Sequence, residues 1–305
     1  MRLLIINNLA SGLHEGAIYE FIRVFAREGD DIELRSTSGG RRIEDMLDGA
    51  DAFDAVVASG GDGTLAAVAY GLRYTGVPIL PFPAGTANLT ADNLDMPNEV
   101  HALAKLLREG TAFDFDLGEL VIDGKTIGFT MIAGMGFDAA IMKDAASMKS
   151  WLGTWAYYQA AINNAFHPAL HFTLDVDGNI VKFNGLGVMG MNFATLQGGI
   201  AIAHENRPRD GMLDVALLKA GSAFGLLPAL GAAMLDADGA YPDRPGTLEF
   251  YRAKELTITC EKPLYVQYDG DVIGNADTCT IRILPSATRY FVPESSLARF
   301  DGGRE

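Results

Sequence analysis

The chain has 305 residues, of which 49% are hydrophobic and 21% charged, as in an ordinary globular protein and unlike a disordered one. Its 39 acidic residues outnumber its 24 basic residues and give a formal net charge of −15, which disfavours binding to nucleic acid and loose adhesion to anionic membranes. No apolar stretch reaches the roughly 20 residues that span a bilayer, and the first apolar run is too short for a signal peptide, so we expect a soluble, cytoplasmic protein.

The first part of the chain, residues 1–112, alternates strand-like and helix-like segments. The pattern predicts strands at 3–7, 31–36, 55–59 and 77–82, and helices at 17–28, 43–47, 65–74 and 99–108. Strands that alternate with helices imply a parallel sheet covered on both faces, with ligands bound at the carboxyl ends of the strands. We therefore expect an α/β N-terminal domain over residues 1–112, completed by residues 286–305.

From about residue 113 the pattern changes to short strands. These are expected at 119–122, 126–133, 171–176, 180–183, 186–192, 213–218, 255–259, 264–267 and 278–284, with helical stretches at 139–165 and 222–235. The pairs Asp123-Gly124, Asp177-Gly178 and Asp269-Gly270 are hairpin-turn signals. We expect a β-rich, sandwich-like C-terminal domain over 113–285, after which segments 290–292 and 297–300 return to the first domain.

The two cysteines of the chain, Cys260 and Cys279, both lie in this β-rich part. They could pair in a disulfide, but two buried thiols are the more common arrangement in a cytosolic protein.

A glycine-rich segment, Ser59-Gly60-Gly61-Asp62-Gly63-Thr64, follows the apolar run 55–58 directly. Its three glycines permit positive φ and a close approach of the main chain, and the N-terminus of a helix opened by Thr64 favours an anion. The Asp62 carboxylate would repel phosphates unless Mg²⁺ lies between them, so it points to a metal–nucleotide ligand. A plain strand-to-helix turn is the alternative interpretation.

Two further loops follow strands of the same predicted sheet. Asn8, Ser11 and Gly12 come after the first strand, and Gly85, Thr86 and Asn88 come after the fourth. Each loop alone is typical of an ordinary turn or a helix cap. Because the carboxyl ends of parallel strands lie at one edge of a sheet, the three loops together predict a single ligand-sized crevice.

Two Asp-Gly motifs stand in the β-rich half, Asp210-Gly211-Met212-Leu213-Asp214 and Tyr268-Asp269-Gly270-Asp271. Either could be a simple hairpin turn. In sequence order, however, the five motifs resemble those of the diacylglycerol kinase catalytic-domain family, which includes bacterial soluble lipid kinases and the sphingosine and ceramide kinases. The resemblance covers nearly the whole chain. Its glycine-rich Asp motif is shared with NAD kinases, whereas the later motifs point to the lipid-kinase branch.

The resemblance implies a two-domain ATP:lipid phosphotransferase that uses Mg²⁺ and has its active site between the domains. It implies a set of nucleotide contacts: Asn8, Ser11, Gly12, Thr37, Gly60, Gly61, Gly63, Thr64, Gly85, Thr86 and Asn88. Asp271 matches the family's general base, Asp269 is the alternative acid, and Asp62 faces the metal. Asp210, with the backbone carbonyls of Met212 and Arg207, would match a second Mg²⁺ site.

Three positions depart from the family pattern. Leu9 stands in place of a proline, and Asp271 in place of a glutamate that is one methylene longer. Residues 203–206 replace a proline followed by a small residue, beside the expected second metal site.

The lipid substrate would be reached through transient membrane contact, and a homodimer is one assembly that we consider. Candidates for an apolar lipid slot are Trp151, Trp155, Tyr157, Tyr158, Met131, Met135, Met189 and Met191, although core packing explains most such residues. Two other functions remain open: a kinase of a soluble polyol or nucleotide related to NAD kinases, and a nucleotide-binding regulator without catalysis.

Overall fold

A computed structural model describes residues 1–11, 16–37, 42–136, 169–196, 200–201, 207–219 and 247–300. The first half contains β1 (Arg2–Asn7), α1 (Ala17–Phe25), β2 (Asp31–Ser36), the 3-10 helices η1 (Glu44–Met46) and η2 (Ala50–Ala52), β3 (Ala55–Gly60), α2 (Asp62–Gly71), β4 (Ile79–Pro83), α3 (Leu89–Asn93) and α4 (Val100–Glu109). Strands β2, β1, β3 and β4 are neighbours in that order, and each pair is parallel. The expected α/β arrangement is therefore confirmed.

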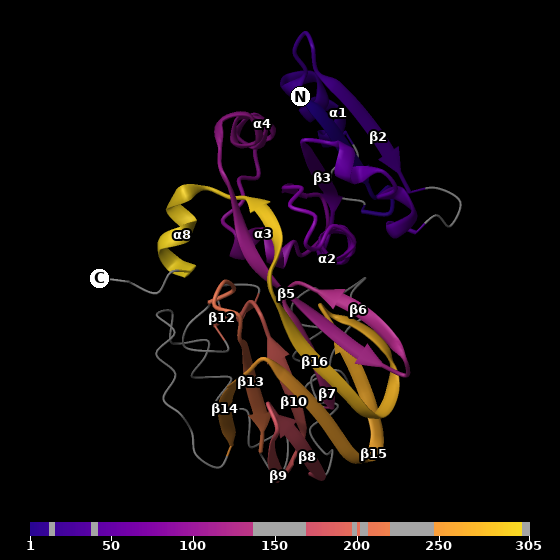
Figure 1. Ribbon diagram of the computed structural model, residues 1–305, viewed down its shortest axis with the longest axis vertical. Helices are drawn as coiled ribbons and strands as arrows, with labels where there is room; N and C mark the ends of the chain where they lie inside the picture. The colour runs from indigo at the N-terminus through magenta and orange to yellow at the C-terminus, as the bar shows by residue number, and fades with distance from the viewer. Residues whose placement is uncertain are drawn as a thin grey trace.

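The second half is dominated by antiparallel strands. It contains β5 (Ala112–Ile122), β6 (Lys125–Phe129), β7 (Ile132–Gly136), β8 (Leu170–Val176), β9 (Asn179–Gly185), β10 (Gly187–Met191), β11 (Thr195–Leu196), β12 (Ile200–Ala201), β13 (Leu213–Leu218), β14 (Leu248–Ala253), β15 (Glu255–Tyr268), β16 (Asp271–Phe291) and α8 (Glu294–Phe300). Figure 1 shows most of the antiparallel strands below the parallel strands, with α2 at the level where the two halves meet and α8 beside α3.

The three expected Asp-Gly turns are confirmed as tight hairpins. Asp123, Asp177 and Asp269 have φ values of 49°, 50° and 44°, and the glycine that follows each also has a positive φ. Two successive residues with positive φ match the right-handed twist of the flanking strands, and Asp-Gly tolerates this conformation. These turns join β5 to β6, β8 to β9 and β15 to β16.

Strand β16 belongs to both halves of the molecule. It pairs with β15 in the β-rich half, while Tyr290 near its other end aligns in parallel with Ile79 of β4. Its register against β5 shifts between Leu284 and Thr288, where Ser286 has a φ of 48°. The expected strand at 278–284 and the first two residues of the returning segment 290–292 therefore belong to one strand interrupted by a bulge, which Figure 1 shows in orange to yellow.

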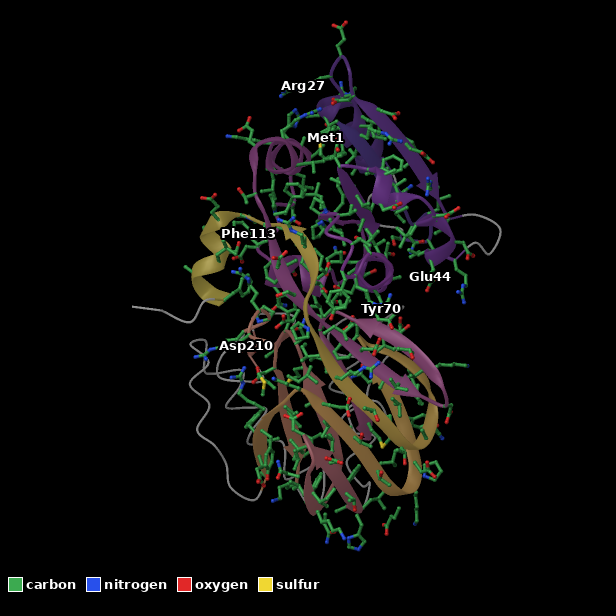
Figure 2. All side chains as sticks on the ribbon, in the orientation of Figure 1. Met1, Arg27, Glu44, Tyr70, Phe113 and Asp210 are labelled. Atoms are coloured by element: carbon green, nitrogen blue, oxygen red, sulfur yellow. The ribbon has the colours of Figure 1, made fainter. Side chains whose placement is uncertain are left out.

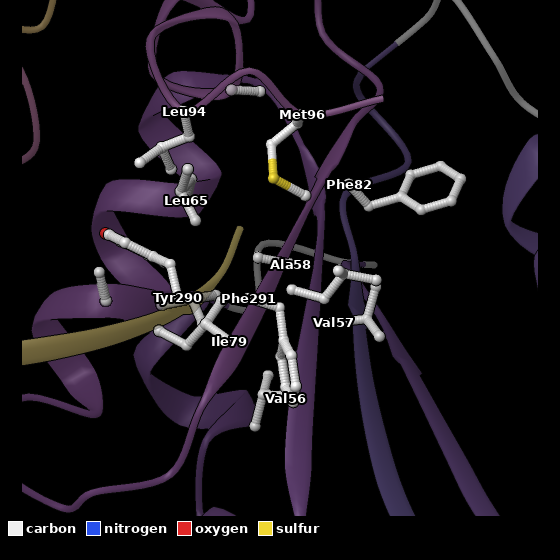
Figure 3. Packing of buried hydrophobic residues seen from close by; sticks show 14 of the residues in the cluster. Val56, Val57, Ala58, Leu65, Ile79, Phe82, Leu94, Met96, Tyr290 and Phe291 are labelled. Atoms are coloured by element: carbon white, nitrogen blue, oxygen red, sulfur yellow. The ribbon is translucent and has the colours of Figure 1, made fainter. Parts of the chain in front are cut away.

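Two clusters of buried apolar side chains form the cores. The first surrounds the parallel sheet, and Figure 3 shows Val56, Val57 and Ile79 packed near Tyr290 and Phe291. The second fills the antiparallel strands of the β-rich half.

The first core also includes aromatic residues from beyond the expected boundary at 112/113. Phe115 has its ring centroid 5.5 Å from Tyr290, 5.5 Å from Phe300 and 6.2 Å from Phe193. Burial of each such ring contributes about 2 kcal/mol, so this aromatic cluster ties the two halves together. The division into domains at 112/113 stays a prediction.

Several expected bounds are wrong. Helix α1 ends at Phe25, three residues early, because Ala26 is already extended. Helix α2 begins at Asp62 instead of Thr64 and ends at Gly71, since Tyr74 has a φ of 61°. The expected strand at 126–133 is two strands, β6 and β7. The helices expected at 139–165 and 222–235 lie outside the described residues.

Cys260 and Cys279 are both buried thiols that form no disulfide, which is the arrangement favoured from the sequence. Over the part of the chain that the structure describes, no helix is both long enough and apolar enough to cross a membrane.

Candidate active site between the two halves

The glycine-rich segment lies where β3 ends and α2 begins. Gly60, Gly61 and Gly63 do not use the positive φ that glycine permits, and Gly61 is extended, with φ −89° and ψ −172°. Close contact requires a glycine at two positions, Gly60, where a Cβ would lie 2.3 Å from the Oγ1 of Thr64, and Gly85 in the next loop. A Cβ on Gly85 would lie 2.4 Å from the Cα of Gly61, so the loops after β3 and β4 touch backbone to backbone. The backbone N–H groups in the first turn of α2 lie beside this contact.

The loop after β1 joins the same site through a hydrogen-bonded set of side chains. The Nδ2 of Asn8 donates to the Oγ1 of Thr64 at 2.9 Å, and its Oδ1 accepts from the Oγ1 of Thr37 at 3.2 Å. The Oγ1 of Thr37 in turn accepts from the backbone N–H of Leu9. Three of the expected nucleotide contacts are thus brought together by the structure. The N–H of Ser11 donates to the carbonyl of Asn8, and Gly12 lies outside the described residues.

The loop after β4 is held by hydrogen bonds between its own residues. Asn88, with a φ of 52°, accepts from the N–H of Gly85 at 2.8 Å and donates to its carbonyl at 2.9 Å. Its side chain therefore shapes the loop, while Thr86 is exposed at the tip. A small pocket opens between this loop and the glycine-rich segment, lined by Ala58, Gly60, Gly61, Asp62, Leu65, Pro81, Phe82, Pro83, Asn88 and Ala91.

Asp62 holds the start of α3. Its two carboxylate oxygens accept the backbone N–H groups of Leu89 at 3.1 Å and of Thr90 at 2.8 Å. Each oxygen of a carboxylate has about two acceptor sites, so one site on each remains for another ligand.

Asp269 is the most heavily hydrogen-bonded of the candidate acids. Its carboxylate accepts the N–H groups of Thr130, Met131 and Ile132 at 2.7–3.0 Å and the hydroxyl of Thr130 at 3.0 Å. Desolvation by burial raises the pKa of Asp269 to about 6, against these backbone donors, which lower it, and with a smaller upward contribution from Asp62. Its acceptor sites are filled by Thr130, Met131 and Ile132, where β6 ends and β7 begins.

Asp271, the first residue of β16, is exposed and faces the glycine-rich segment. Its Oδ2 lies 3.8 Å from the point where a Cβ of Gly63 would stand. Nearby, burial and the charges of Asp271, Asp269 and Glu44 raise the pKa of the Tyr268 hydroxyl. The structure therefore brings residue 271 to the N-terminus of α2, although the two are far apart in sequence.

Carboxylates gather on this side of the site and influence one another. Burial, and then the charge of Asp62, raises the pKa of Asp92 in α3, and Asp62 also acts on Asp269. A cation next to Asp62 and Asp92 would relieve this repulsion, so the donor set fits Mg²⁺ carried by a nucleotide. Among the described residues, no three His, Cys, Asp or Glu side chains form a metal cluster by themselves.

The expected second metal site lies in the β-rich half, where Figure 2 labels Asp210. The Oδ1 of Asp210 accepts from the N–H of Met212 at 3.0 Å, and its Oδ2 forms an ion pair with Arg252. Arg252 also lies 3.4 Å from Asp214. The charge of Asp210 is thus met by a guanidinium, an arrangement that does not fit a metal ion well. The assignment of Asp210, Met212 and Arg207 to a metal stays a prediction.

A buried acid supports the same Asp-Gly loop. Asp116 of β5 accepts the N–H groups of Gly211 at 2.6 Å and of Ser286 at 2.8 Å. Burial raises the pKa of Asp116, against these two hydrogen bonds, which lower it. Asp116 therefore fixes the loop to the bulge of β16.

The methionines considered for a lipid slot are mostly core residues. Met131, Met135 and Met191 are buried, and Met189 packs partly buried against the first core. The aromatic candidates at 151–158 lie outside the described residues. Sequence reasoning missed Thr90, Thr130 and Asp92, which lie beside Asp62 and Asp269, because isolated threonines and an exposed helical aspartate have no sequence signal.

Comparison with known proteins gives two family matches. Residues 2–120 match the diacylglycerol kinase catalytic domain, and residues 131–292 match the YegS C-terminal NAD kinase beta sandwich-like domain. A diacylglycerol kinase of Mycobacterium tuberculosis is 30% identical over 72% of this chain and 70% of its own length. A probable YegS-like lipid kinase of Stenotrophomonas maltophilia is 27% identical over 95% of each chain.

A solved structure has a similar fold. The crystal structure of a putative diacylglycerol kinase from Bacillus anthracis superposes with a TM-score of 0.77 at 19% identity, over 97% of this chain and 96% of that one. The chain also matches an uncharacterized Synechocystis protein at 27% identity and spans 58% of that protein's length.

Proposed function

Because the chain belongs to the diacylglycerol kinase catalytic-domain family, we propose that it is an ATP-dependent, Mg²⁺-requiring lipid kinase. It transfers the γ-phosphoryl group to a hydroxyl of a lipid of the diacylglycerol class. The observation that carries the proposal is the approach of the exposed Asp271 carboxylate to Gly63, at the N-terminus of α2.

Each requirement of phosphoryl transfer has a candidate in the site. The reaction needs the phosphates positioned, their charge neutralised and the attacking hydroxyl deprotonated. The N–H groups at the start of α2 bind phosphate oxygens, with Asn8 and Thr37 holding Thr64 in place. Asp62 and Asp92 would hold a magnesium ion, which would neutralise charge on the phosphates.

Asp271 acts as the general base. As the lipid oxygen forms a bond to the γ-phosphorus, the bond to the β-phosphate oxygen breaks, ADP leaves and the hydroxyl proton passes to the Asp271 carboxylate. Asp269 is the poorer candidate because its carboxylate already accepts four hydrogen bonds. We further propose that the lipid is reached by transient contact with a membrane, with a homodimer as one assembly.

Radiolabelled phosphate transfer tests the proposal. Purified protein with ATP and Mg²⁺ is offered micelles containing diacylglycerol, micelles containing sphingosine, NAD in solution, or no acceptor. Label in the diacylglycerol product is expected. Label in NAD would support the NAD-kinase-like alternative, and nucleotide binding with no transfer to any acceptor would support the non-catalytic regulator.

Two matched pairs of variants test the residues. Asp62→Asn and Asp271→Asn are each expected to reduce transfer by about a hundredfold or more, because each removes a charge that acts on the reacting groups. Asp51→Asn and Asp277→Asn change exposed carboxylates away from the site and should leave transfer unchanged. Full transfer by Asp271→Asn would overturn the assignment of the base.

A further inference from the structure

Two carboxylates of the site each hold the backbone of a neighbouring segment. Asp62, in the glycine-rich segment, accepts the N–H groups of Leu89 and Thr90 at the start of α3. Asp269, in the turn that precedes Asp271, accepts the N–H groups of the residues between β6 and β7, including Thr130. The two held segments come from opposite halves of the molecule.

The two segments meet at a pair of buried hydroxyls. The Oγ1 of Thr90 lies 2.8 Å from the Oγ1 of Thr130, and the two residues are 0% and 1% exposed. We name this contact the threonine bridge. It completes a continuous path from Asp62 through Thr90 and Thr130 to Asp269.

The hydrogen bonds along this path have a defined direction. A threonine hydroxyl has one proton, and Thr130 donates its proton to the Oδ2 of Asp269 at 3.0 Å. Thr90 must therefore donate to Thr130. With an ionised Asp269 at the end of the chain, each hydroxyl is polarised toward that carboxylate, which strengthens both bonds in a buried environment.

We propose that Thr90 and Thr130 are positioning residues for phosphoryl transfer, and that the threonine bridge fixes the acceptor-side turn relative to the phosphate-binding segment. This inference rests on the proposed function and adds to it a physical connection between the two sides of the site. Asp269 and Gly270 form a tight turn with φ values of 44° and 90°, and Asp271 follows at once. A displacement of Asp269 therefore moves the Asp271 backbone.

Loss of the threonine bridge should slow the reaction because the base is then at the wrong distance from the acceptor hydroxyl. A base must lie within about 3 Å of the proton that it accepts, and a misplacement of about 1 Å can lower a rate by about a hundredfold. Removal of the bridge leaves each carboxylate with its own backbone contacts but allows the Asp269 turn to shift relative to the Asp62 segment, so nucleotide binding should be little affected. The loss should appear in the transfer step.

Kinetics of valine and serine variants test the bridge. Thr90→Val and Thr130→Val keep the side-chain shape but remove the hydroxyl, and each should lower kcat by about tenfold to a hundredfold, with KM for ATP changed by less than about twofold. The double variant should lose no more than the worse single variant, since all three lack the same connection. Thr90→Ser keeps a hydroxyl at this position and should retain the wild-type kcat.

A second threonine pair supplies the control. The Oγ1 atoms of Thr257 and Thr280 lie 3.0 Å apart between β15 and β16. Thr257→Val should therefore leave kcat unchanged. Valine variants of the bridge with full kcat would overturn the proposal, as would a rise in KM for ATP that accounts for the whole loss.

Hydrogen exchange measures the connection without any catalysis. Thr130→Val should speed exchange of the Leu89 and Thr90 amides, and Thr90→Val should speed exchange of the Met131 and Ile132 amides. Accelerated exchange confined to the substituted side would overturn the bridge. A wild-type protein that transfers no phosphate to any lipid would overturn the proposed function alone, because the exchange result does not depend on it.

Discussion

The Oδ2 of Asp271 lies 3.8 Å from the point where a Cβ of Gly63 would stand, so one methyl group would fit between Gly63, in the first turn of α2, and the proposed base. This distance is an ordinary van der Waals contact, and Gly63 has no positive φ. An alanine is therefore compatible with the fold.

Gly63→Ala should stabilise the protein and inhibit it. Alanine is a better helix former than glycine by up to about 1 kcal/mol, so the thermal unfolding temperature should rise slightly. The methyl group stands where the acceptor hydroxyl must approach Asp271, so kcat should fall by about tenfold or more. Differential scanning calorimetry and phosphate-transfer assays measure the two effects. Gly16→Ala, where a Cβ has no neighbour within 4 Å, is the control; a Gly63→Ala variant with full activity would contradict the prediction.

Tyr70→Phe should loosen α2 from the β-rich half. The Tyr70 hydroxyl donates to the buried carboxylate of Glu119 on β5, which also pairs with Arg282 of β16. Figure 2 shows Tyr70 at the junction of the halves. Loss of one hydrogen bond to a charged group should lower the free energy of unfolding by about 1.5 to 3 kcal/mol, measured by urea denaturation.

The matched control is Tyr19→Phe, because Tyr19 is exposed on α1. The same variants can be titrated spectroscopically. Burial, and then the hydrogen bond to Glu119, raises the pKa of Tyr70 to about 12, so Tyr70→Phe should remove a phenol that ionises well above the usual range. An unchanged unfolding free energy in Tyr70→Phe would show that α2 is held by packing alone.

The pH dependence of stability should contain a contribution from Asp269. Its pKa in the folded protein is raised to about 6 from an ordinary value of 3.8, so the folded state binds a proton more tightly than the unfolded state between these values. The contribution is then fully present below about pH 4 and is lost as the pH rises through 6. Unfolding free energies of wild type and Asp269→Asn, measured from pH 4 to 7, should diverge accordingly.

The wild type should lose stability relative to Asp269→Asn as the pH rises through this window. A difference that stays constant from pH 4 to 7 would contradict the raised pKa. Asp277→Asn, at an exposed position on β16, should show a constant difference.

Arg252 should determine whether the Asp210 loop responds to magnesium. In wild type the guanidinium pairs with Asp210 and Asp214, so Mg²⁺ without nucleotide should not stabilise this loop. Arg252→Gln removes the guanidinium from the carboxylates of Asp210 and Asp214, which makes this partly exposed position a better oxygen-ligand environment for the ion. The thermal unfolding temperature of the variant should then be higher in millimolar Mg²⁺ than in the presence of a chelator.

An Asp210→Asn substitution in the Arg252→Gln background should abolish the new magnesium response, which places it at this loop. A wild type that is already stabilised by Mg²⁺, with the response removed by Asp210→Asn, would instead support the second metal site expected from the family resemblance.

Local chemistry explains what could be predicted from the sequence. The Asp-Gly turns could be predicted because few residue pairs tolerate two consecutive positive φ values. Three of the four parallel strands, β1, β3 and β4, could be predicted because each is a short apolar run, and β2 because its apolar residues alternate with polar ones. The three loops could be placed together because strand ends in a parallel sheet share one edge.

Long-range pairings could not be predicted. Glu119 and Arg282 are 163 residues apart, and Thr90 and Thr130 are 40 apart, with no pattern in either pair that relates one residue to the other. The start of α2 was misplaced because Thr64 is a typical N-cap residue, whereas here Asp62 lies within the helix and binds α3. The expected strand at 278–284 ends too early, since β16 continues past Leu284 through a bulge to Phe291.

The course of β16 limits how this protein can be divided. The strand starts at Asp271 beside the glycine-rich segment and reaches β4 at Tyr290, where it covers the edge of the parallel sheet. A fragment that stops at residue 112 would leave β4 as an open edge, with its backbone groups free to pair with another chain. We therefore expect that the family's two sequence modules do not fold separately in this chain: a half expressed alone should aggregate, and exchange of one half between relatives should require that β16 be exchanged with it.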